Sequence, residues 1–300
     1  MHPTSFRRTA NSRSWARYSI YADRSIIVLN KPPGLICQGS ESQTHVPPPR
    51  DVDKFNDLLY DLKYRFHMSN LPYAVHRLDK STTGALVLAK NLVTARQLAQ
   101  QFQTRTVGKT YLALVRGGEK SFPAKFGEIR EALETSKEGR VLIGTSCDAK
   151  FAATDWELIA SSTKAPLSLL RLTLHTGLKH QLRVHLAHSL HTPILGDTLY
   201  SRKPISEKIT HLLRIPEHRL FLHSSQLILS RFRKAGTKKH LRLGITAALP
   251  GDFVSMCKDL GIQLDPKDVS GGLCVDDQPV SGGSIEDLQG KWLRPWHHMS

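Results

Sequence analysis

The stretch HRLDKSTTGALVLAK, His76 to Lys90, sets one carboxylate between two cations and then enters an apolar run. Arg77 and Lys80 flank Asp79, and neighbouring positive charges favour the ionised form of a carboxylate. An ionised carboxylate can serve as a nucleophile or a base. Taken alone, the triplet fits a solvated surface with ordinary ion pairs at least as well. The rest of the chain decides between these interpretations.

Hydrophobic periodicity around this stretch predicts two amphipathic helices. In DKFNDLLYDLKYRFH (53–67) the apolar residues recur at helical spacing, which indicates one buried face. NLVTARQLAQQF (91–102) shows the same spacing, with Asn91 as the N-cap. KHQLRVHLAHSL (179–190) is expected to form a further short helix.

Strands are expected to outnumber helices. SIIVLNKPPGLI (25–36) reads as a β-branched strand that ends at the Pro-Pro-Gly turn. KTYLALVRGG (109–118) alternates with a period of two and ends in a glycine pair. Other runs of strand character are VLIG, ATDWELIA, LSLLRLTLH, FLHSSQLILS and HLRLGITAAL. The pattern predicts a mixed fold.

The composition indicates a polyanionic partner. Lys and Arg number 42 against 26 Asp and Glu, which gives a net charge of +16 and a pI near 9.9. Nucleic acid is the first candidate, although a charge excess also serves solubility. No run of eighteen apolar residues occurs, so we expect no membrane span. Four widely separated cysteines without a CxxC pair argue against a zinc knuckle or a disulfide framework.

The two ends of the chain differ from its middle. Residues 1–17 are rich in Arg and Ser and contain no acid, which predicts a mitochondrial presequence; a basic arm that contacts RNA is the alternative. Residues 264–300 are polar and rich in Gly, Asp and Ser, so we expect a tail that cannot order itself alone. Trp292, Leu293 and Trp296 could still dock it on the body.

Four blocks occur together in one order: NKPPGLI, HRLDKSTTG, the KTY strand, and TGLKHQLRVH followed by PILGDTLY. In this combination the chain resembles the RluA-type pseudouridine synthases, over about Tyr18 to Pro250. The resemblance implies an α+β catalytic domain at 18–263, with a central mixed, mainly antiparallel sheet, flanking helices and an RNA-binding cleft.

The same resemblance implies the chemistry. Isomerising uridine to pseudouridine breaks a C–N glycosidic bond, rotates the uracil and joins C1′ to C5, a redox-neutral reaction that needs no cofactor. Asp79 matches the catalytic aspartate. Tyr111 matches the tyrosine that stacks on the flipped base, although a strand tyrosine is more often core. Arg183 matches the arginine that pairs with the aspartate and holds it ionised.

The RNA-binding residues also follow from the resemblance. Arg77 matches a side chain that enters the stack in place of the departed base. Lys109, Lys179, His180 and Gln181 belong to the matching blocks and are candidates for contacts with RNA.

The sequence departs from the family pattern at Leu178, where an arginine is usual. Lys179 can restore the charge but cannot copy a bidentate contact. This change supports the alternative of a non-catalytic RNA-binding or ribosome-assembly factor. His180, His185, His188 and His191 are spaced invitingly for a metal, but no acid or cysteine is close in sequence, so we expect no metal site.

The sequence therefore predicts a cofactor-independent pseudouridine synthase of mitochondrial RNA, with ribosomal RNA favoured and tRNA open. We expect a monomer without a membrane partner. The basic turn SRFRKAGTKKHLR (230–242) is equally compatible with gripping phosphates and with an ordinary exposed hairpin.

Overall fold

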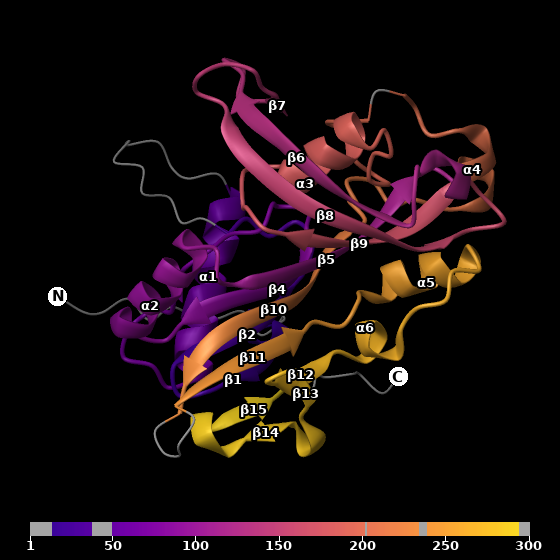
Figure 1. The fold of residues 1–300 in the computed structure, drawn as a ribbon. Coiled ribbons are helices and arrows are strands. Elements are labelled where there is room, and N and C mark those ends of the chain that lie inside the picture. Colours follow the sequence, from indigo (N-terminus) through magenta and orange to yellow (C-terminus); the bar gives the residue numbers. More distant parts are fainter. Residues whose placement is uncertain (1–13, 38–49, 202, 234–238, 294–300) are drawn as a thin grey trace.

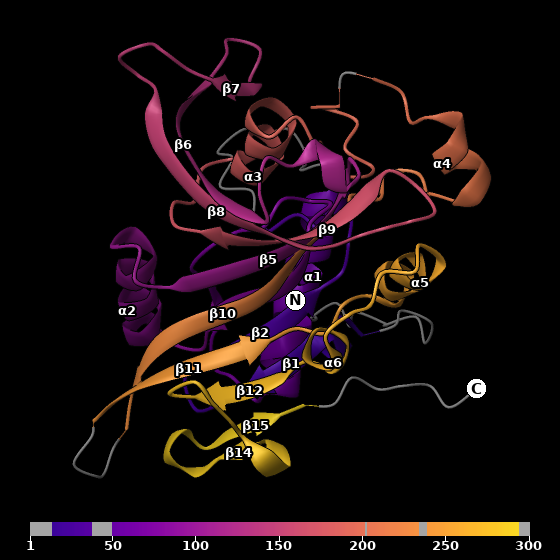
Figure 2. The same cartoon turned by 45° about the vertical axis from the view of Figure 1, so that its right-hand side comes forward.

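A computed structural model describes residues 14–37, 50–201, 203–233 and 239–293. Within this part, strands dominate and join into one sheet (Figures 1 and 2). The strands are β1 (Ser19–Ala22), β2 (Ile26–Lys31), β3 (Tyr73–Ala74), β4 (Thr83–Ala89), β5 (Gly108–Arg116), β6 (Phe126–Thr135), β7 (Val141–Ile143), β8 (Lys150–Ser161), β9 (Leu167–Leu174), β10 (Leu222–Phe232), β11 (His240–Thr246), β12 (Gly272–Val275), β13 (Gln278–Pro279), β14 (Ser284–Ile285) and β15 (Gly290–Trp292).

The α-helices lie around the sheet (Figure 2). They are α1 (Arg50–Arg65), α2 (Leu92–Gln103), α3 (Gln181–Val184), α4 (Glu207–Leu212), α5 (Gly251–Asp259) and α6 (Pro266–Ser270). A π-helical turn, His185–Ser189, continues α3.

The strand order confirms the expected mixed, mainly antiparallel sheet. The main path runs β14-β15-β1-β2-β4-β10-β5-β9-β8-β6-β7; β11 branches from β10, and β12 pairs with β11. Among the described strands the pairing of β4 with β10 is parallel, and the others are antiparallel. This parallel pair lies at the middle of the sheet, and the turn that contains Asp79 leads into β4.

The two predicted amphipathic helices cover opposite faces of the sheet. Leu86 and Leu88 of β4 enter the same apolar cluster as the buried face of α1. Ala85 and Val87, one step along the strand, enter a second cluster with the buried face of α2. Because successive strand side chains point to opposite faces, β4 needs apolar residues throughout, and every one of its residues is buried.

The C-terminal segment differs from the polar tail expected for 264–300. Its described part, up to Leu293, forms α6 and β12 to β15; β12 extends β11 and β15 pairs with β1. Leu273, Ile285 and Leu288 are buried against the second cluster. These few apolar residues could not form a core alone, but they add to a core and to sheet edges that the preceding chain provides.

The start of the described chain also differs from the expected presequence boundary at residue 17. Trp15–Tyr18 form a 3₁₀ turn that packs on α1, and Ala16 is buried. The Trp15 backbone N–H donates to Asp61 at 2.8 Å, and Arg65 donates to the Ala16 carbonyl at 2.9 Å. Residues 15–17 are thus part of the folded body. The rest of the expected presequence, residues 1–13, lies outside the described residues.

Candidate active site

One pocket gathers the three expected catalytic residues from segments far apart in the chain. Asp79 lies in the turn before β4, Tyr111 on β5 and Arg183 on α3. The pocket has a volume of about 150 Å³. Its wall consists of Arg77, Leu78, Asp79, Thr82, Tyr111, Leu174, Gly177, Leu178, Lys179, His180, Gln181, Leu182, Arg183 and Leu222.

A buried lysine holds the Asp79 turn in place. The Lys31 ammonium donates to the carbonyls of Pro32 (3.0 Å), Leu35 (2.9 Å) and Lys80 (3.0 Å), so it ties the Pro-Pro-Gly turn to the residue after Asp79. The Gly34 N–H also donates to the Lys80 carbonyl, at 2.8 Å. Burial lowers the pKa of Lys31 to about 8. Three acceptors therefore offset the cost of burying its charge.

A close strand contact fixes the chain just after Asp79. Gly84 has a φ of +110°, and a Cβ there would lie 2.2 Å from the Ser224 carbonyl oxygen of β10. Only glycine allows this approach of β4 to β10. Beside it, His223 donates from Nε2 to the Ala247 carbonyl at 3.1 Å and accepts from the Thr83 hydroxyl at Nδ1, at 2.9 Å. Burial lowers the pKa of His223 to about 4, which keeps the ring neutral.

Tyr111 is both a core residue and part of the pocket wall. It belongs to the α1-side cluster and is 7% exposed, yet it lines the pocket with Asp79. Burial, with a smaller contribution from Asp79, raises the pKa of Tyr111 to about 12. The phenol therefore stays protonated at neutral pH and can donate a hydrogen bond.

Arg183 forms its ion pair with Asp197 instead of the expected pair with Asp79. Its Nε and Nη2 donate to the two oxygens of Asp197, each at 2.8 Å, and its Cζ lies 5.1 Å from the centre of the Tyr200 ring. The Asp197 side chain is almost completely buried. It accepts both of these guanidinium hydrogen bonds, so it fixes the orientation of the Arg183 side chain. Burial opposes the charge of Arg183, but Asp197, and more weakly Asp79, raise its pKa overall.

Asp197 itself is held ionised. Burial alone would raise its pKa, but the Arg183 guanidinium and the backbone N–H groups of Tyr200 and Leu199 outweigh burial and lower it. Both N–H groups donate to Oδ1, at 3.1 and 2.9 Å. Among the described residues, Nη1 of Arg183 has no hydrogen-bond partner, so it remains able to contact a ligand in the pocket.

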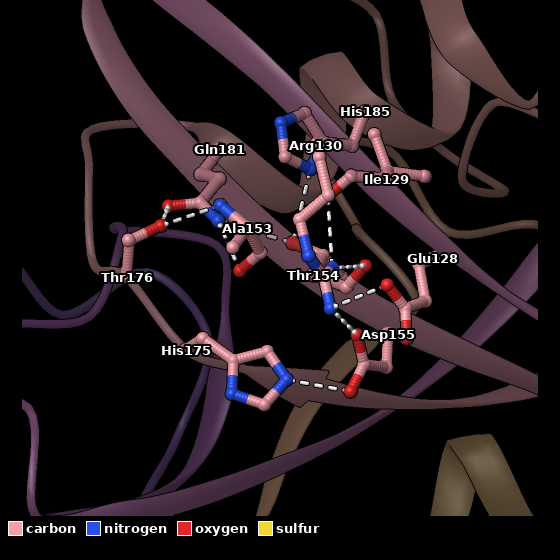
Figure 3. Close-up of polar contacts among 10 residues, drawn as sticks. All are labelled: Glu128, Ile129, Arg130, Ala153, Thr154, Asp155, His175, Thr176, Gln181 and His185. Atoms are coloured by element: carbon pink, nitrogen blue, oxygen red, sulfur yellow. Dashed lines mark hydrogen bonds and ion pairs between the residues drawn. The ribbon is translucent and has the colours of Figure 1, made fainter.

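Gln181 has a structural role, which differs from the expected contact with RNA. Its Oε1 accepts from the Thr176 hydroxyl (2.7 Å) and the Leu178 N–H (3.1 Å). Its Nε2 donates to the Ala153 carbonyl and the Thr154 hydroxyl, both at 3.0 Å (Figure 3). All four hydrogen-bonding positions of the amide are used inside the protein. Gln181 therefore fastens the loop before α3 to β8.

Three of the other expected RNA-binding residues line the Asp79 pocket, and the fourth, Lys109, lies outside it. Arg77 is exposed at the pocket wall, and Lys179 donates to the Gly139 carbonyl at 3.1 Å. His180 adopts a φ of +54° and shares a 2.9 Å hydrogen bond with the Tyr200 hydroxyl. Lys109 is buried and lines a neighbouring cavity rather than the pocket of Asp79.

Leu178 packs where the resemblance had suggested a cation. It is half-buried against a small cluster that includes Val184 and Tyr200, and it also lines the pocket. The substitution therefore exchanges a charge at the pocket wall for apolar contact.

The described residues contain no group of three or more His, Cys, Asp or Glu side chains placed to hold a metal ion. His185 instead bonds through Nδ1 to the Thr154 hydroxyl at 3.0 Å, and burial lowers its pKa to about 4. Over the described part of the chain, each helix is too short or too polar to span a membrane.

Sequence reasoning missed Lys31, Asp197 and His223. Lys31 and Asp197 lie inside the quoted blocks NKPPGLI and PILGDTLY, whose polar residues were the available signal. His223 lies in FLHSSQLILS, and nothing in that run distinguishes a buried, doubly bonded histidine from a surface one.

Comparison with solved structures assigns the fold. The chain is similar to human RNA pseudouridylate synthase domain containing 4, with a TM-score of 0.65 and 29% identity, over 83% of this chain and 95% of that one. Human RNA pseudouridylate synthase domain containing 1 gives a TM-score of 0.54 and 25% identity, over 83% and 96%. Both of these structures are named as pseudouridylate synthase domain proteins.

The sequence comparisons agree. Residues 25–188 match the RNA pseudouridylate synthase family. The chain is 41% identical to ribosomal large subunit pseudouridine synthase D of Borreliella burgdorferi, over 65% of this chain and 58% of that protein. It is 30% identical to the mitochondrial pseudouridylate synthase RPUSD4 of Mus musculus, over 87% of this chain and 74% of that protein. The chain belongs to the RNA pseudouridylate synthase family.

The matched lengths differ among these relatives. The chain spans 58% of the Borreliella burgdorferi protein and 57% of an uncharacterized RNA pseudouridine synthase of Aquifex aeolicus, to which it is 35% identical over 62% of its own length.

Proposed function

We propose that this protein isomerises uridine to pseudouridine in RNA, with Asp79 as the reacting carboxylate. The observation that carries the proposal is the single pocket that unites Asp79, Tyr111 and Arg183. Family membership and the net charge of +16 support it, because the substrate is a polyanion.

The pocket offers groups suited to each part of the reaction. The C1′–N1 bond must break, the uracil must turn, and C5 must bond to C1′ and then lose its proton. Asp79 supplies the carboxylate beside the reacting sugar and base. Arg183 stabilises its negative charge from nearby, and the protonated Tyr111 hydroxyl can direct proton movement at C5.

The target uridine must leave its stack to reach this pocket. Extruding a base costs a few kcal/mol, which contacts with the protein must offset. Tyr111 supplies an aromatic wall for the base inside the pocket. Arg77 is exposed at the rim, so its planar guanidinium can occupy the vacated position in the RNA.

The proposed substrate is a mitochondrial ribosomal RNA, and the proposed working form is a monomer. The ribosomal assignment is supported by relatives named ribosomal large subunit pseudouridine synthases. The compartment is supported by the mouse and bovine relatives named mitochondrial, and by the Arg-rich, acid-free composition of residues 1–13. Bacterial relatives are also close, so the compartment needs a direct test.

A pseudouridine map across all RNA classes tests the proposal in cells that lack the protein. The cells are supplied again with the intact chain, with Asp79→Ala, or with Asp148→Asn as a control at an exposed carboxylate outside the pocket. We expect one or more mitochondrial sites to disappear and to return with the intact chain and the control only.

Two other outcomes would count against parts of the proposal. Loss of sites outside mitochondria would reject the compartment but retain the chemistry. If no site changes, the chain is a non-catalytic RNA-binding or ribosome-assembly factor, and the exchange of a cation for Leu178 at the pocket wall becomes the first explanation.

A further inference from the structure

A second cavity, of about 220 Å³, lies beside the active-site pocket and is basic. Four of its lining residues are Arg105, Lys109, His175 and Arg242, and no carboxylate is among its described lining residues. The remaining wall consists of Thr106, Val107, Gly108, Thr173, Leu174, Ile228 and Ser230. The positive charges of Arg105, Lys109 and Arg242 therefore gather at a wall without acids, which is costly unless an anion binds there.

Two of these four side chains, those of Arg242 and His175, already have acidic partners. Arg242 pairs with Asp277 at 2.9 Å on the exposed surface. His175 shares a 2.5 Å hydrogen bond with Asp155, whose other oxygen accepts from Arg130 (Figure 3). These pairs leave the charges of Arg105 and Lys109 to be explained.

Lys109 is a buried ammonium with an incomplete set of partners. It is 8% exposed, and its one hydrogen bond among the described residues is a long contact of 3.4 Å to the Thr176 carbonyl. An ammonium has three donors, and a good bond would be shorter than about 3.2 Å. Burial, and secondarily the nearby Arg105, lower the pKa of Lys109 to about 8. A negative ligand would accept the unused hydrogen bonds of the ammonium and would also stabilise its charge.

Arg105 approaches the same cavity from the turn after α2. It is exposed and adopts a φ of +60°, a conformation that few non-glycine residues take. Its side chain makes no ion pair with any described residue. The guanidinium therefore remains available for a phosphate, which it can bind with two parallel hydrogen bonds.

The cavity is placed to receive RNA that enters the active site. Lys109 and Tyr111 are two residues apart on β5, so they point to the same face about 7 Å apart. Leu174 lines both cavities, and Lys109 of the second cavity contacts the carbonyl of Thr176, the residue before Gly177 in the wall of the active-site pocket. A strand whose flipped base lies on Tyr111 would pass its backbone near Lys109.

We propose that this cavity is a phosphate-binding subsite, in which Arg105 and Lys109 hold a backbone phosphodiester of the RNA next to the flipped uridine. The inference rests on the proposed function for its choice of RNA. It assigns Lys109 to the phosphate backbone and adds Arg105, which the sequence motifs did not single out.

Binding of a short single-stranded oligouridylate tests the subsite without requiring catalysis. Dissociation constants are measured over a potassium chloride series for Asp79→Asn and for the same chain carrying Arg105→Gln or Lys109→Met. Arg96→Gln, an exposed arginine on α2 outside both cavities, removes the same charge as a control. Thermal unfolding checks that each variant is folded. If Lys109→Met does not fold, Arg105→Gln alone still tests the subsite.

We expect Arg105→Gln to weaken binding about tenfold, as for loss of a charge-assisted hydrogen bond. The logarithm of the association constant falls with the logarithm of the salt concentration, and the steepness of this fall should decrease by about 0.7 for the lost contact. Arg96→Gln should change neither value. Equal constants and slopes for Arg105→Gln and Arg96→Gln would overturn the subsite.

Inorganic phosphate distinguishes an RNA subsite from a site for small anions. If phosphate stabilises the intact chain but Arg105→Gln binds oligouridylate as tightly as the control, the cavity takes free anions and the RNA assignment is wrong. Failure of the proposed function would look different: pseudouridine would not form, while the binding differences between variants would persist.

Discussion

The Arg183–Asp197 pair shows how a single residue can position another. Asp197 is 14 residues from Arg183 and is 1% exposed, and it accepts both guanidinium hydrogen bonds. Asp79 lies in the same pocket but accepts neither of these hydrogen bonds. Asp197 is therefore a positioning residue, and the orientation of Arg183 does not depend on Asp79.

Asp197→Asn should impair turnover more than RNA binding. The amide cannot accept both arginine hydrogen bonds, so Arg183 loses its orientation while the exposed contacts to RNA remain. We expect kcat to fall by about tenfold or more, with KM changed by less, since buried pairs broken on one side are costly. Asp277→Asn, in the exposed pair with Arg242, should alter neither kcat nor stability measurably. Equal losses in kcat and in RNA affinity would contradict a positioning role.

Buried histidines should make the fold sensitive to acid. The pKa of His223 is lowered to about 4 in the folded state, whereas an unfolded histidine titrates near 6.5. Between these values the unfolded chain binds more protons, so stability is fully present above about pH 6.5 and is lost as pH falls toward 4. We expect His223 to account for up to about 3 kcal/mol of this loss.

Urea unfolding at a series of pH values measures this effect. His223→Gln should be less stable at neutral pH but should lose less stability between pH about 6.5 and 4.5. His211→Gln, at an exposed position of α4, should follow the pH profile of the intact chain. An unchanged profile in His223→Gln would refute the assignment.

At the scale of elements, the central parallel pair β4–β10 positions the site, because the turn that contains Asp79 leads into β4. Gly84→Ala would force its Cβ to 2.2 Å from the Ser224 carbonyl oxygen at a φ of +110°. Overpacking and strain together should cost about 3 kcal/mol of stability. Gly251→Ala, at the start of α5 with open space around its Cβ, should be within about 0.5 kcal/mol of the parent. Thermal melting of both variants compares them directly.

The C-terminal strands are a second element-scale feature. A chain ending at residue 263 would lose the buried Leu273, Ile285 and Leu288 and would expose the edges of β1 and β11. We expect a lower melting temperature and concentration-dependent aggregation, because exposed edges pair with other chains. Melting and light scattering of the shortened chain check this; a melting temperature equal to that of the full chain would show that the segment adds nothing.

At the scale of the whole molecule, local patterns predicted more than distant pairings did. The helices α1 and α2 follow from hydrophobic periodicity and the Asn91 cap from the N-cap preference of Asn, and the Asn91 side chain does accept from the Thr94 N–H at 2.9 Å. The pairing of Trp292 with Tyr21 joins the two ends of the chain, and no local pattern encodes it. The order of the C-terminal segment could not be predicted for that reason.

In the candidate site, too, the residues were predictable from local motifs, whereas their contacts with distant segments were not. Asp79, Tyr111 and Arg183, each of which lies in a recognisable block, line one pocket. The partner of Arg183 was wrong, because spacing along a chain does not show which of two carboxylates a guanidinium faces. The fully bonded amide of Gln181 likewise depends on β8, which lies about thirty residues away in sequence.

In the proposed reaction, Asp79 drives formation of the new C1′–C5 bond. An RNA carrying the mapped target site, with tritium at C5 of its uridines, measures this directly, because the isomerisation must release the C5 hydrogen to water. We predict release by the intact chain and none above background with Asp79→Asn, although both bind oligouridylate equally well. Release by Asp79→Asn at the rate of the intact chain would contradict the account.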